Sequence, residues 1–72
     1  KRSLTKSILA KTRRRYNVSI NEIGDFESLD FLLIGLASVG TSNKNVDKSL
    51  EQCIKFIEST YLLEIIEINR YY

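Results

Sequence analysis

The sequence predicts an α+β fold in the order helix, strand, strand, helix, strand, and three patterns carry this prediction. Residues 3–15 and 44–59 place apolar side chains at helical spacing. Residues 16–23 alternate apolar with polar side chains, as a strand with one buried face does. Residues 31–39 are almost continuously apolar, and residues 61–69 are rich in isoleucine. A chain of 72 residues forms one domain at most.

The first helix is expected over residues 3–15. Leu4, Ile8 and Thr12 recur every four residues and therefore fall on one stripe, which we expect to face the core. No glycine or proline interrupts the segment. Asn17 follows it closely and is a candidate for a left-handed residue that ends the helix.

Two strands are expected next, with a turn or bulge at Gly24 and Asp25 between them. The apolar character of residues 31–39 suits a strand covered on both faces or a central strand, and a helix is the alternative. The strand is favoured because the run has only nine residues, contains Gly35 and ends at Gly40.

The second helix is expected over residues 44–59, with Ser42 or Asn43 as its N-cap. Its apolar stripe comprises Val46, Leu50, Cys53, Ile54 and Ile57. Cys53 is the one cysteine and the chain has no histidine, so neither an internal disulfide nor a zinc site is predicted. We interpret Cys53 as a small buried hydrophobic residue.

This order of elements is the later part of a split β-α-β sandwich, a mainly antiparallel sheet with two helices on one face. The order lacks one element, because in such a sandwich a first strand precedes the first helix. The sequence also opens at Lys1, already inside a helical pattern. We therefore expect residues 1–72 to be a single domain that is incomplete at its N-terminus.

The run from Arg13 to Asp25, RRRYNVSINEIGD, resembles the signature of the YlxP-like family. Lys1-Arg2, Gly35, Ala37 and the segment 56–59 extend the resemblance over essentially the whole chain. The resemblance implies a ferredoxin-like fold and a bacterial protein of unknown function. Genes of this family often lie beside genes of translation, which implies a link to RNA or ribosomes.

Two departures from the family pattern bear on these implications. The family's first strand, which lies centrally in a ferredoxin-like sheet, is absent from this sequence. Phe26 and Leu29 stand in the hairpin loop where relatives often carry a polar residue and a tryptophan.

Charge is strongly asymmetric along the chain. Residues 1–15 hold seven basic residues and no acidic one, and the remaining residues hold four basic and nine acidic ones. Such a basic segment predicts an anionic partner, or association between oppositely charged ends of two copies. On a helix, Arg2, Lys6 and Arg13 form one stripe. Lys11 and Arg14 lie on another flank of the same helix. The predicted nucleic-acid-binding residues are Arg2, Lys6, Lys11, Arg13 and Arg14.

The sequence indicates a binding module and not an enzyme. Serine, cysteine and histidine nucleophiles lack partners, and no glycine-rich phosphate loop is present. The carboxylates at Asp25, Glu27 and Asp30 match no metal-binding loop. No catalytic residue, cofactor, metal, membrane segment or small-molecule substrate is predicted.

A cytoplasmic location is expected, because no signal peptide is visible. The first functional hypothesis is an RNA- or ribosome-associated domain. The second is a self-associating structural or regulatory domain, such as a homodimer, with no nucleic-acid role. Acylphosphatase-type catalysis would rest on fold analogy alone.

Overall fold

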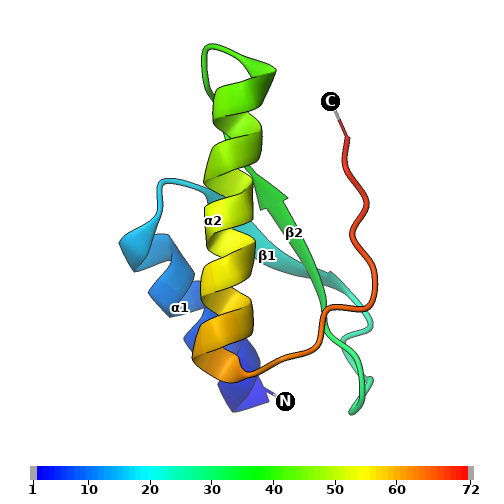
Figure 1. Ribbon diagram of the computed structural model, residues 1–72. Helices are drawn as coiled ribbons and strands as arrows, with labels where there is room; N and C mark the ends of the chain where they lie inside the picture. Colours follow the sequence, from blue (N-terminus) through cyan, green and yellow to red (C-terminus); the bar gives the residue numbers. More distant parts are fainter. Residues whose placement is uncertain (1, 72) are drawn as a thin grey trace.

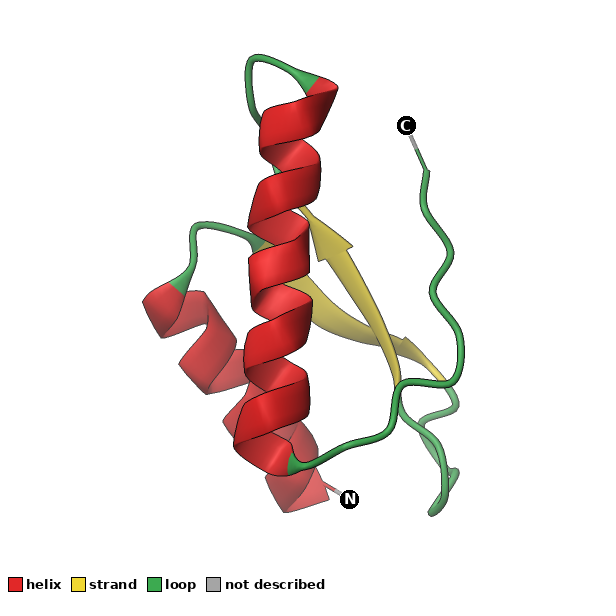
Figure 2. Cartoon of the chain, viewed as in Figure 1, coloured by secondary structure: helices red, strands yellow, loops and turns green. Residues whose placement is uncertain are grey.

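The computed structural model describes residues 2–71 and contains two helices and two strands. In chain order these are α1 (Arg2–Arg15), β1 (Ser19–Gly24), β2 (Leu33–Ala37) and α2 (Asn43–Tyr61). The strands form one antiparallel sheet, and both helices lie on the same face of it (Figures 1 and 2). The predicted α+β class is confirmed.

Helix α1 buries a different stripe from the one expected. Ile8 and Thr12 are buried as predicted, but their companion is Thr5, whereas Leu4 is 37% exposed. The reason is that an i, i+3, i+7 row follows the 3.6-residue turn better than a row of strict fours, which drifts around the helix. Asn17 is not left-handed, since Asp25 and Leu62 are the non-glycine residues with positive φ among those described.

The two strands confirm the hairpin, and the helical alternative for residues 31–39 is excluded. Ile20 faces Leu36 across the ladder, and the register shifts between Glu22 and Gly24, where a bulge or turn was expected. Asp25 follows with φ of 54°, a left-handed conformation that asparagine and aspartate tolerate.

Strand β2 is not covered on both faces. Leu33 and Ala37 are exposed, and β1 is its one paired neighbour within residues 2–71. Its apolar composition suits the helix-facing side, where Ile34 and Leu36 are partly buried against the core. The opposite face is thinly covered, and a Cβ on Gly35 would lie 2.9 Å from Cγ2 of Ile23.

Helix α2 begins where the sequence predicts. Ser42 is its N-cap, with extended backbone and a side-chain oxygen that accepts a hydrogen bond from the Asn45 N–H at 3.2 Å. The helix continues to Tyr61 and ends at Leu62, which is left-handed with φ of 52°. This conformation reverses the chain and sends it back along the sheet (Figure 1).

The predicted strand over residues 61–69 is wrong. Tyr61 belongs to α2, and residues 63–71 are extended but carry no regular secondary structure. Leu63 and Ile65 are half-buried between exposed neighbours, which is the alternation of a strand. A strand requires a hydrogen-bonded neighbour, however, and this segment has no such partner in the sheet of the described chain.

Three isoleucines, Ile8 of α1, Ile20 of β1 and Ile57 of α2, form the buried cluster of the core. Each is 7% exposed or less. Burial of a side chain of this size contributes roughly 1.5–3 kcal/mol. Cys53 is also fully buried, and desolvation raises the pKa of its thiol above the ordinary value. The interpretation of Cys53 as a core residue is confirmed.

Thr12 offers a test of this core. Its side chain is fully buried, and its hydroxyl has no hydrogen-bond partner among the described residues. Thr12→Val keeps the shape and removes the unsatisfied group, so we expect the free energy of unfolding to rise by about 1 kcal/mol. Urea denaturation measures it, with Thr60→Val at an exposed helical position as control. A fall of stability in Thr12→Val would show that the hydroxyl is satisfied.

Candidate nucleic-acid interface

The cations of α1 divide between two flanks of the helix. At about 100° per residue, Arg2, Lys6 and Arg13 lie within about 40° of one another. Lys11, Arg14 and Arg15 lie on the other flank, within about 100°. The first set is on the side of α1 that reaches β1, as the contacts of Arg13 show. The second set borders α2.

Arg13 is a structural residue in this arrangement. Its Nη2 donates hydrogen bonds to the backbone oxygen of Ile20 at 2.7 Å and to Oδ1 of Asn21 at 2.8 Å. The guanidinium therefore ties the last turn of α1 to β1. These bonds occupy Nη2 of Arg13, and a role of this residue in nucleic-acid binding stays a prediction. Arg2 and Lys6 are exposed on the same flank.

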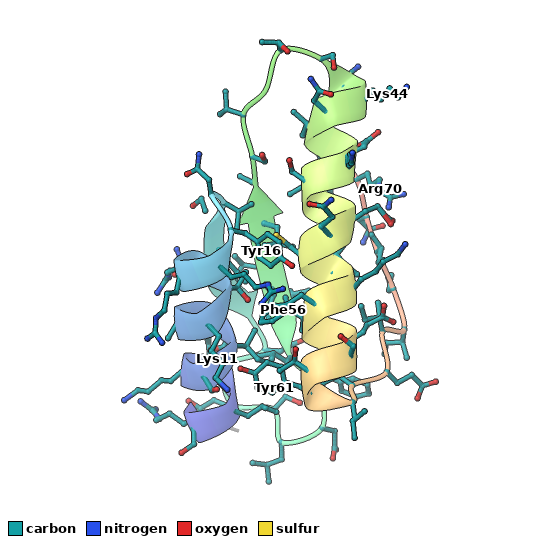
Figure 3. All side chains as sticks on the ribbon, turned by 60° about the vertical axis from the view of Figure 1, so that its left-hand side comes forward. Lys11, Tyr16, Lys44, Phe56, Tyr61 and Arg70 are labelled. Carbon is teal, nitrogen blue, oxygen red and sulfur yellow. The ribbon has the colours of Figure 1, made fainter. Side chains whose placement is uncertain are left out.

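The other flank of α1 and the facing side of α2 form a shallow hollow of about 350 Å³. Figure 3 shows this seam between the helices, with Tyr16 and Phe56 towards one end and Lys11 and Tyr61 towards the other. Its lining residues are Lys11, Arg14, Arg15, Phe56 and Thr60. Three cations and one aromatic ring thus line the same hollow, and no carboxylate lines it.

Phe56 is the aromatic centre of the hollow. Its ring contacts Tyr16 edge to face, with ring centroids 5.6 Å apart and planes at 63°. The guanidinium carbon of Arg15 lies 5.1 Å from the Phe56 centroid and 5.8 Å from that of Tyr16. Arg15 Nε also donates a hydrogen bond to the Tyr16 hydroxyl at 3.3 Å. Arg15 is thereby held over the rings by cation–π attraction.

Lys11 is held in the same way at the other end of the seam. Its Nζ lies 5.8 Å from the ring centroid of Tyr61. The hydroxyl of Tyr61 is hydrogen-bonded to Oγ of Ser7 at 2.8 Å, so that the ring is fixed to α1. The Lys11 side chain therefore meets the hollow with its charge near an aromatic face and not near an acid.

Acidic side chains of α2 lie on its opposite flank. At about 100° per residue, Asp47, Glu51 and Glu58 are about 140° or more from Phe56. Glu51 is engaged there, because Nη2 of Arg70 lies 2.8 Å from its Oε1. The side of α2 that faces α1 is consequently free of carboxylates, and the positive charge of the hollow is not neutralised locally.

The structure brings together two of the five predicted residues, Lys11 and Arg14. Sequence reasoning missed Arg15, Phe56 and Thr60. Arg15 could have been found from helical geometry, since it lies about 40° from Lys11 at about 100° per residue. Phe56 could be found only by knowing which side of α2 faces α1.

Two other features are absent from residues 2–71, a metal-binding cluster and a membrane-spanning helix. No group of three or more histidine, cysteine, aspartate or glutamate side chains is placed to hold a metal ion in that part of the chain. Neither helix described is long and apolar enough to cross a membrane.

A family model for proteins of unknown function, DUF503, matches residues 1–70. The chain belongs to the DUF503 family. This DUF503 chain is 36% identical over 59 residues to the uncharacterized protein YlxP of Bacillus subtilis. The resemblance predicted from the sequence is confirmed.

The alignment with that relative covers 82% of this chain and 64% of the relative, so the DUF503 chain spans less than two thirds of the relative's length. No solved structure matches it. The family is thus established, and because both matches are described as of unknown function or uncharacterized, the function of this chain is inferred from the site.

Arg13 and Arg14 are neighbouring arginines of which only Arg13 is hydrogen-bonded to β1, so the pair tests whether those bonds contribute to stability. Arg13→Gln removes the two bonds to β1, and we expect it to lower the free energy of unfolding by about 1 kcal/mol. Arg14→Gln should leave stability within about 0.5 kcal/mol of the parent, as most exposed substitutions do. Urea denaturation of both variants checks this. Equal stability of the two would mean that the Arg13 bonds contribute nothing.

Proposed function

We propose that this DUF503 protein is a non-enzymatic RNA-binding module whose interface is the hollow between α1 and α2. The observation that carries the proposal is a lining shared by Lys11, Arg14, Arg15 and Phe56 that contains no carboxylate. Arginine and lysine at this spacing can neutralise successive phosphates of a nucleic-acid backbone. Arg2 and Lys6 lie on the opposite flank of α1, away from the hollow, and are not part of this interface.

The chemistry of the hollow supports binding and not catalysis. Its polar groups are cations and one hydroxyl, and it holds no general base or nucleophile–base pair. A cytoplasmic protein that associates with RNA or ribosomes fits this surface. The single buried Cys53 fits a reducing compartment.

The salt dependence of RNA binding tests the proposal. Three neutralised phosphates on a single strand give a slope of log K against log salt of about −2, so affinity should fall roughly twentyfold between about 50 and 200 mM salt. Filter binding with a labelled oligoribonucleotide measures it. Lys11→Gln combined with Arg14→Gln should reduce the slope to about −0.7.

Lys48→Gln combined with Lys55→Gln is the matched control, because it removes two exposed cations from α2 away from the hollow. This control should keep most of the affinity. Absence of binding at low salt, or equal losses in both double variants, would sink the proposed interface.

We further propose that the complete fold is a ferredoxin-like split β-α-β sandwich. The unpaired edge of β2 supports this, together with the extended segment 63–71. That segment runs in the same direction as β2, on the side away from β1 (Figures 1 and 3). A further strand antiparallel to both would pair with each and give the final segment the neighbour it lacks.

Self-association is the second candidate function. Leu33, Ile66 and Ile68, which lie on β2 and the final segment, are 47%, 69% and 48% exposed. Apolar side chains beside an open strand edge form a surface that a second chain can cover.

Light scattering tests self-association directly. We expect a dimer to show twice the mass of one chain, and Ile66→Lys to restore the monomer. Val39→Lys, at a 99% exposed position in the loop after β2, is the control and should leave the mass unchanged. A monomer at high protein concentration would eliminate this candidate and leave the RNA proposal intact.

A further inference from the structure

The proposed function requires cations that bind phosphates, but phosphate binding alone does not explain the aromatic ring of Phe56 in the lining of the hollow. A polyanion site needs charge alone, and exposed cations anywhere on α1 would provide it. Here the ring of Phe56 is half-buried in the hollow, and Arg15 lies 5.1 Å from its centroid. The positive centre is thus paired with a stacking surface.

Contacts with Tyr16 hold both members of this stacking surface, Phe56 and Arg15, in place. Tyr16 supports Phe56 edge to face at 5.6 Å and accepts a hydrogen bond from Arg15 Nε. A guanidinium held over an aromatic ring presents a planar outer face, on which an unpaired nucleobase can stack. Thr60 adds a hydroxyl at the wall, which can donate to or accept from a base edge.

The remaining cations, Lys11 and Arg14, border the same hollow. Arg14 belongs to the same lining as Arg15. Lys11 also lines it, with Nζ near the ring of Tyr61. A stacking plane with cations at its border is the arrangement by which proteins bind single strands without reading a sequence. A duplex keeps its bases stacked inside and offers no free face to this floor.

Resting on the proposed function, we propose that the hollow selects single-stranded nucleic acid by stacking one unpaired base on the Arg15–Phe56 pair, while Lys11 and Arg14 hold the flanking phosphates. The ligand class is therefore a single strand with bases, and not any polyanion of equal charge.

The test compares two probes of equal phosphate number, an oligoribonucleotide and an abasic strand of the same length. We expect the base-containing strand to bind about tenfold more tightly, within the range for stacking of one base. Arg15→Lys keeps the charge and removes the planar guanidinium, so the preference of the variant for the base-containing strand should fall to about twofold or less.

Two further variants secure the interpretation. Arg70→Lys is the matched control, because Arg70 pairs with Glu51 on the other flank of α2, and it should keep the preference. Phe56→Leu should lose the preference as Arg15→Lys does, and circular dichroism confirms that it is folded. Should Phe56→Leu unfold, the surface variant Arg15→Lys still decides.

The outcomes separate the two proposals. Equal, salt-dependent binding of both probes by the parent protein would overturn base stacking and leave phosphate binding standing. A preference that survives Arg15→Lys would place the base elsewhere and overturn the assignment of this hollow. No binding of either probe at low salt would overturn the proposed function and this inference together.

Discussion

The contact among Ile8, Ile20 and Ile57 is the constraint on which the rest of the molecule depends. Each isoleucine comes from a different element, so one buried cluster fixes α1, β1 and α2 relative to one another. A domain of this size buries only roughly 60% of its unfolded surface, and the partly buried apolar side chains around the cluster, such as Leu36 and Leu63, pack against it. The seam between the helices is a by-product of this packing.

The same contact fixes the rotation of α1 about its axis, and with it the use of each cation. Once Ile8 and Thr12 face the core, Arg13 must point towards β1, where a strand carbonyl and Asn21 receive it. Lys11 and Arg14 must point to the other flank. Neighbouring arginines therefore take unrelated roles, one tying elements together and the other leaving its charge in solvent.

Most of the fold could be predicted because its signals are local. Ser42 as N-cap, the buried Cys53 and the irregularity at Gly24 all depend on a few adjacent residues. The strand predicted over residues 61–69 is absent, because isoleucines indicate extended backbone, whereas a strand also requires a pairing neighbour far away in the sequence. The contacts of Arg13 could not be predicted for the same reason, since its partners lie on another element. The place of Phe56 in the hollow is likewise set by how two helices pack.

Because Cys53 is buried, the reactivity of its thiol reports how often the core opens. A thiol at 0% exposure cannot meet a reagent in the closed structure, and its raised pKa keeps the reactive thiolate scarce. Modification of this sulfur must therefore wait for the surrounding side chains to separate. The rate of this modification therefore measures local opening of the core in the native ensemble.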